Sequence, residues 1–354
     1  MLNGLDEIDW AALEHAYGAA EDVPDQLRAL VSADDTERSD ALGELFGNIY
    51  HQGTIYEATA YAVPFLLEAL TAPECEEQPH LLFLLASIVV GYDEMWLPGG
   101  LPIAEHRATA ANEPADEDYA KNWVRAYDAV RAGVPLFRAL LTSEPQVRCL
   151  AAYALAWFPE EAADSLRALA PITADPDEAV AATASVAMGL LGGRPAFDDT
   201  RPLARWGAAV ALGTVDGPAA ADEVVDELIA ATSLPDSDQV PFLEGNLAAL
   251  AGSVLRLTGD RHTARTLTAL LDRIPALSGT SAFHVVKEAL HLAFPSGAAP
   301  EDLDDAQRRL VDVLVASPGA WLINGNRFGN FSMLVREYGL PDSHEAMRAY
   351  TSTR

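Results

Sequence analysis

The sequence predicts an all-α fold in which helical hairpins stack side by side as a right-handed α-solenoid. Two observations carry this prediction, a motif that recurs along the chain and apolar residues that recur every three or four positions around it. A third is the scarcity of strand signals, because no Asn-Gly or Asp-Gly pair lies between segments of alternating polarity. We therefore expect no β-hairpin.

The recurring motif is clearest at residues 145–155, Pro-Gln-Val-Arg-Cys-Leu-Ala-Ala-Tyr-Ala-Leu. It returns 57 residues later, at residues 202–212, with the same proline, arginine and Ala-Ala-x-Ala-Leu in the same places. A weaker copy occupies residues 177–188, and a fourth surrounds Arg38. Each copy predicts a helix whose small residues let a neighbouring helix approach closely.

A second helix precedes several of these copies. Val-Pro pairs at residues 23–24, 63–64 and 134–135 each open an apolar helical stripe, and the first turn of a helix tolerates proline. We therefore expect helices at 23–30, 63–70 and 134–141. Apolar periodicity predicts further helices at residues 81–90, 223–231, 242–257, 264–274 and 283–294.

The motif at residues 144–155, with its copies at 177–188 and around Arg205, resembles HEAT repeats, and the chain is similar to bacterial HEAT-repeat proteins. The resemblance covers residues 23–215 and implies a solenoid with a concave binding face. The sequence departs from the HEAT pattern at Ala181, where an arginine is expected. It also departs in the step of 24 residues between the last two copies, which is too short for a full repeat.

This organisation divides the chain into four parts. We expect HEAT-like repeats at residues 1–92, an acidic loop rich in proline and glycine at 93–122, central repeats at 123–216, and divergent repeats with a C-terminal cap at 217–354. Loops as long as the second part are usually functional or disordered. Trp96 and the prolines and glycines after it indicate an ordered flap, and Trp96 is a candidate binding residue there.

Composition places the protein among folded cytoplasmic proteins. Its 354 residues are 50% hydrophobic, which is too apolar for disorder, and no apolar run reaches the ~18 residues that a membrane span requires. Two cysteines, Cys75 and Cys149, cannot form a disulfide framework and are typical of a reducing compartment. The first residues lack the features of a secretory signal.

The charge restricts the partners. With 23 Lys and Arg against 53 Asp and Glu, the net charge is −30, which disfavours nucleic acid because phosphate binding needs clustered cations. Acidic clusters at residues 21–40, 113–118 and 301–305 are expected to be solvated helix ends, or alternatively to face a basic partner.

One helix carries a candidate metal site. His284, Glu288 and His291 stand at i, i+4 and i+7, so they share a face, and the Glu-x-x-His spacing occurs in metal sites of helical bundles. The alternative is a polar stripe, since no second Glu-x-x-His occurs in the chain. Apart from a divalent metal here, no cofactor is expected.

Two turns carry candidate binding residues. His51, Gln52 and Tyr56 lie where one predicted helix turns into the next, and His51 serves either as a ligand contact or as a helix cap. Near the C-terminus, binding residues are predicted among aromatic and polar types enriched at interfaces, the alternative being a structural cap. These residues are Trp321, Asn324, Asn326, Arg327 and Phe328.

We expect a scaffold that binds a protein or peptide, possibly basic, on the concave face of the solenoid, because the chain has no nucleophile elbow, phosphate-binding loop or dinucleotide fingerprint. A metal-dependent or small-molecule enzyme on the same scaffold is the alternative. HEAT-like folds include alkylpurine DNA glycosylases, but this chain lacks their basic face. An acidic inhibitor or immunity protein directed at a basic partner is the third hypothesis.

Overall fold

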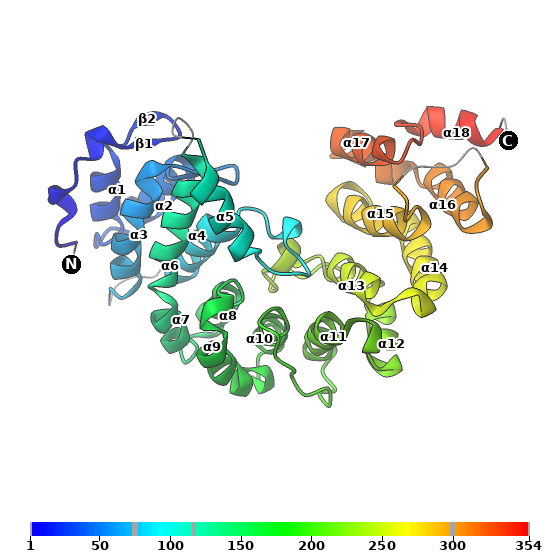
Figure 1. Cartoon of the computed structure of the whole chain (residues 1–354), viewed down its shortest axis with the longest axis horizontal. Helices are drawn as coiled ribbons and strands as arrows, with labels where there is room; N and C mark the ends of the chain where they lie inside the picture. The colour runs from blue at the N-terminus through cyan, green and yellow to red at the C-terminus, as the bar shows by residue number, and fades with distance from the viewer. Residues whose placement is uncertain (1, 73–76, 115–117, 298–301, 353–354) are drawn as a thin grey trace. The chain divides into compact units, whose positions relative to one another are not determined.

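The computed structural model describes residues 2–72, 77–114, 118–297 and 302–352, and over these it is mostly helical (Figure 1). Cys75 lies outside the described residues. The chain forms two compact units, residues 1–195 and 196–354. The all-α class is therefore confirmed. None of the described helices is both long and apolar enough to cross a membrane.

The first unit contains ten α-helices in its described part. They are α1 (Val23–Ala29), α2 (Asp35–Asn48), α3 (Glu57–Leu70), α4 (Gln78–Val90), α5 (Ile103–Asn112), α6 (Tyr119–Arg131), α7 (Val134–Leu140), α8 (Pro145–Leu155), α9 (Ala162–Leu169) and α10 (Glu178–Leu190). Pairs that follow one another in sequence, such as α1 with α2 and α7 with α8, pack together. Helix α8 also packs on α4 and α10.

The arginine of the repeated motif has the same role in three copies. Arg38 donates from Nη1 to the carbonyl of Ser32 at 2.9 Å, and Arg148 donates to Ser143 at 2.6 Å. In the second unit, Arg205 donates to the carbonyl of Phe197 at 3.3 Å. Each guanidinium therefore fastens the start of its helix to the preceding turn.

Small residues make α10 a helix that is buried along most of its length. Its residues 179–189 are all buried, and most of them are alanine, serine or glycine. A helix covered on every side has to approach its neighbours closely, which small side chains permit. Asp177 caps this helix by accepting the backbone N–H groups of Ala179 and Val180 at 2.9 and 3.2 Å.

The second predicted helix begins earlier than its proline indicates. We expect a helix from residue 63, but α3 starts at Glu57 and carries Pro64 in its interior. The start is fixed by a cap, because the backbone N–H of Tyr56 donates to Oγ1 of Thr59 at 2.9 Å. The proline position was therefore a misleading sign of the helix start.

Residues 93–122 are not one loop. The described part contains the 3-10 helix η3 (Asp93–Met95) and α5, and α6 already begins at Tyr119. Helix α5 packs on α6. The prediction was wrong because α5 is weakly amphipathic and buries only Ile103, so its sequence shows no clear apolar stripe.

Three short hairpins contradict the expectation that no strands pair. They are β1 (Glu14–His15) with β2 (Gly18–Ala19), β3 (Tyr50–His51) with β4 (Thr54–Ile55), and β5 (Leu322–Ile323) with β6 (Asn326–Arg327). At two tips both central residues have positive φ, 51° and 82° at Gln52-Gly53 and 51° and 76° at Asn324-Gly325. Such turns match the twist of two-residue hairpins. Strands this short leave no alternating pattern.

The second unit contains eight described α-helices. They are α11 (Pro202–Asp216), α12 (Asp222–Ala231), α13 (Leu247–Leu255), α14 (Thr263–Arg273), α15 (Gly279–Ala293), α16 (Asp305–Ala316), α17 (Gly329–Glu337) and α18 (His344–Ser352). The helix predicted at 242–257 starts only at Leu247, because Leu243, Glu244 and Gly245 have positive φ. A core of apolar side chains from α14 to α18 holds the C-terminal part together.

Candidate functional site

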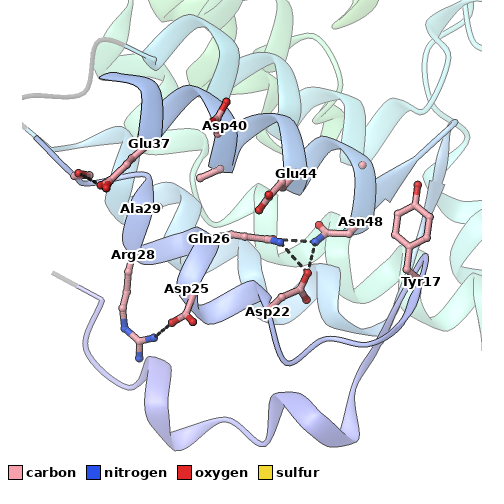
Figure 2. Close-up of a pocket in the computed structure, with 13 residues that line it drawn as sticks. Tyr17, Asp22, Asp25, Gln26, Arg28, Ala29, Glu37, Asp40, Glu44 and Asn48 are labelled. Atoms are coloured by element: carbon pink, nitrogen blue, oxygen red, sulfur yellow. Dashed lines mark hydrogen bonds and ion pairs between the residues drawn. The ribbon is translucent and has the colours of Figure 1, made fainter. Parts of the chain in front are cut away.

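An open groove lies on α1 and α2, with a volume of about 1140 Å³ (Figure 2). Its charged lining is mostly acidic and comes from both helices and the turn before α1. The carboxylates are Asp22, Asp25, Glu37, Asp40 and Glu44, and the cation is Arg28. We call this feature the acidic groove.

The one arginine in the acidic groove is already neutralised. Nη1 of Arg28 donates to Oδ1 of Asp25 at 2.7 Å, and Nη2 is paired with Asp6. On α2, by contrast, the exposed carboxylates of Asp40 and Glu44 form no ion pair with any described residue. Two like charges at i and i+4 on a helix repel each other. The groove therefore presents unneutralised negative charge.

A hydrogen-bonded network joins α1, α2 and the turn before α1 in the groove (Figure 2). Nε2 of Gln26 donates to Asp22 at 2.9 Å, and Nδ2 of Asn48 donates to Oε1 of Gln26 at 2.9 Å. Nε2 of His15 donates to the other oxygen of Asp22 at 2.8 Å. This carboxylate is therefore fixed in position before any ligand arrives.

Hairpin β3–β4 borders the acidic groove. The exposed Tyr17, which lines the groove, packs edge-on against His51 with ring centroids 5.5 Å apart. Nδ1 of His51 donates to the carbonyl of Gly47 at 2.9 Å, at the end of α2. His51 thus has the capping contact named as its alternative role.

The structure places Gln52 and Trp96 together. Both line a second, smaller cavity of about 330 Å³, which lies beyond the tip of β3–β4. Tyr56 is not among its described lining residues, although it lies near enough to Tyr119 to raise the pKa of that phenol, an effect second to burial. Gln52 and Trp96 are far apart in the sequence and come together only in the folded chain.

His284, Glu288 and His291 do not form a metal site. No group of three His, Cys, Asp or Glu side chains among the described residues could hold a metal ion. The buried Glu288 carboxylate is paired with Arg256, and burial raises its pKa to about 7 even though that arginine lowers it. Nδ1 of His291 donates to the carbonyl of Lys287 at 2.8 Å. Helical spacing placed these residues on one face, but their polar atoms have other partners.

The C-terminal candidates separate into core and surface. Trp321 and Phe328 are buried in the core of the second unit, and the indole of Trp321 donates to the carbonyl of Leu314 at 3.1 Å. Both are core residues rather than exposed binding residues. Asn324, Asn326 and Arg327 are exposed on hairpin β5–β6, where Nη2 of Arg327 donates to the carbonyl of Asp342 at 3.0 Å.

Sequence reasoning found part of the acidic groove. The cluster at residues 21–40 includes four of its five carboxylates, but Tyr17 and Glu44 were missed. Glu37, Asp40 and Glu44 recur at helical spacing, which could have shown one acidic face of α2. Nothing local marks Tyr17, whose position depends on hairpin β1–β2.

Comparisons with known proteins add little. No protein-family model matches the chain, and no curated protein matches its sequence. Among solved structures, the crystal structure of an engineered protein aligns over 94% of this chain and 92% of that one, with 18% identity and a TM-score of 0.32. A likeness of this size carries no argument about fold or function.

Proposed function

We propose that the protein is a HEAT-like α-solenoid of the cytoplasm that acts as a scaffold and binds a basic protein or peptide in the acidic groove. The packing of sequence-neighbouring helices and the equivalent contacts of Arg38, Arg148 and Arg205 support the repeat architecture. The acidic groove is the single observation that carries the binding function.

The dimensions of the groove favour a polypeptide over a small molecule. Its volume, about 1140 Å³, exceeds the ~300–1,000 Å³ typical of small-molecule pockets, and the groove is open to solvent and lined by charged side chains of both helices. A lysine- or arginine-rich segment would meet carboxylates along both walls. Exposed ion pairs contribute only ~0–1 kcal/mol each, so several are needed together.

Electrostatics would act mainly on the rate and specificity of association. A net charge of −30 attracts cationic partners over long range, and this attraction weakens as salt shortens the screening length. The fixed Asp22 and the unpaired Asp40 and Glu44 would then set where the partner binds. An inhibitor of a basic partner would use the same groove, which makes it the second candidate function.

The test is binding of a fluorescent arginine-rich peptide, measured by anisotropy at low salt. We expect the double variant Asp40→Asn/Glu44→Gln to weaken binding about tenfold, since it removes two of the five carboxylates. The matched control is Asp312→Asn/Glu345→Gln, which removes two exposed carboxylates of the second unit and changes the net charge equally. If both variants weakened binding equally, the overall charge alone would explain the binding, and the groove would be refuted as the binding site.

A further inference from the structure

The smaller cavity of the first unit is lined by aromatic rings from several elements. Its volume is about 330 Å³, and it is more enclosed than the acidic groove. The rings belong to residues after α4, on α5 and on α6. They are Tyr92, Trp96, His106, Tyr119 and Trp123. We call this feature the aromatic pocket.

The indoles of the aromatic pocket are held by hydrogen bonds to backbone carbonyls at the end of α4. Nε1 of Trp96 donates to the carbonyl of Val90 at 2.7 Å, and Nε1 of Trp123 donates to Val89 at 3.1 Å. The buried Trp123 stacks on His106, with ring centroids 4.2 Å apart. The rings therefore need no ligand to keep their positions, so the pocket is preformed.

Tyr92 and Tyr119 form the exposed rim, with 50% and 55% of their surfaces accessible. Tyr92 lies so close to Gly53 that a Cβ on that glycine would stand 2.7 Å from the phenol ring. Gly53 also has φ of 82°, which side chains rarely adopt. The turn of β3–β4 is thus fitted to the position of Tyr92.

The described lining contains no Lys, Arg, Asp or Glu. An anionic ligand would find no cation there and would be repelled by the net charge of −30. A cation would be attracted by that charge and stabilised by the negative faces of the aromatic rings. Because no carboxylate of the described lining is in place to form an ion pair, a weakly hydrated cation is favoured over a primary ammonium.

One residue that lines the pocket has a buried nitrogen without a hydrogen-bond partner among the described atoms. This nitrogen is Nε2 of His106. Burial lowers the pKa of this imidazole, so the ring is neutral near pH 7 and can pair with a hydroxyl. A ligand with a polar group a few bonds from its cationic head would satisfy it.

We propose that the aromatic pocket binds a methylated ammonium group, with Tyr92, Trp96 and Tyr119 as the cage. This proposal does not depend on the acidic groove. The group could belong to a free small molecule such as choline or to a trimethyl-lysine side chain of a peptide, and the chemistry of recognition is the same.

The experiment titrates the full chain with choline, with its uncharged isostere 3,3-dimethyl-1-butanol, and with a short peptide carrying trimethyl-lysine, following tryptophan fluorescence and calorimetry. We expect choline or the peptide to bind about tenfold more tightly than the neutral isostere. The tighter of these two identifies the source. Equal affinity for choline and the isostere, or no binding up to about 50 mM, would overturn the proposal.

Variants of the rim tyrosines show whether these rings bind the cation or only support the fold. Tyr119→Leu should weaken binding of the preferred cation at least about threefold, whereas Tyr119→Phe keeps the ring and should retain it. Each variant is checked for unchanged thermal unfolding. Should Tyr119→Leu prove unstable, Tyr92→Leu with Tyr92→Phe repeats the comparison at the other exposed tyrosine of the rim. Unchanged affinity in the folded leucine variant would refute the cage.

Discussion

The guanidinium of Arg148 connects two consecutive copies of the motif in the first unit. Nε and Nη2 lie 3.0 and 3.1 Å from the two oxygens of Asp175, and Nη1 donates to the carbonyl of Ser143. Asp175 in turn accepts the backbone N–H of Asp177, the residue that caps α10. One side chain therefore fixes the turn before its own helix and the start of the next.

We expect Arg148→Ala to lower the free energy of unfolding of the first unit by about 3 kcal/mol, because it removes the guanidinium that pairs with the nearly buried Asp175 carboxylate. The measurement is urea-induced unfolding followed by circular dichroism. Arg167→Ala is the matched control, since that arginine pairs with Asp164 on the exposed surface of α9 and should contribute at most ~1 kcal/mol. Similar losses in both variants would contradict a special role for Arg148.

Single residues also explain why part of the candidate site escaped sequence analysis. The pair Gln52-Gly53 adopts the positive φ values of a two-residue hairpin, but glutamine rarely does so, and the pair was interpreted as a helix end. The capping role of His51 was one of two predicted roles. The proximity of Gln52 to Trp96 depends on packing between distant segments, which no local pattern encodes.

At the scale of elements, small residues decide how closely helices pack. Ala184 in α10 is completely buried, and α10 packs on α8. Alanine and leucine have similar helix propensities, so replacing one by the other tests space rather than helix formation. The motif predicted this close approach, and the complete burial of Ala184 agrees with it.

Ala184→Leu should lower the free energy of unfolding by about 1–3 kcal/mol, since the added carbons have to displace packed neighbours. Differential scanning calorimetry would detect this as a decrease in the Tm of the first unit. The control is Ala163→Leu at an exposed position of α9, where we expect a change within ~0.5 kcal/mol. A decrease in the Tm of Ala184→Leu no larger than that of the control would mean that the interior of α10 tolerates the larger side chain as well as the surface does.

Several elements with an apolar stripe were predicted well, although α9 and α16 were not predicted despite their amphipathic sequences. The expected helices at 23–30, 134–141 and 264–274 agree closely with α1, α7 and α14. Helix α5 was missed because it buries a single residue, and the hairpins were missed because their strands are two residues long. Local periodicity shows only those elements whose own side chains form much of the core.

At the scale of the whole molecule, carboxylates far outnumber the cations available to neutralise them. The 53 acidic residues face 23 lysines and arginines. Several of these cations already form ion pairs, such as Arg205 with Glu227 and Arg309 with Asp272. The uncompensated charge is spread over a folded chain, where like charges repel more strongly than in the expanded unfolded state.

This excess predicts that salt stabilises the protein. Raising NaCl from about 10 mM to about 150 mM shortens the screening length from about 30 Å to about 8 Å, which weakens long-range repulsion more than contacts within an ion pair. If the weaker repulsion raises the free energy of unfolding by about 1 kcal/mol, the Tm rises by about 2–4 °C for units of this size. The measurement is thermal unfolding at pH 7 in NaCl, with sodium sulfate at equal ionic strength as the control for screening. A Tm that falls with salt would show that the surface ion pairs outweigh the repulsion, and the acidic groove would then lose its role as a source of long-range attraction.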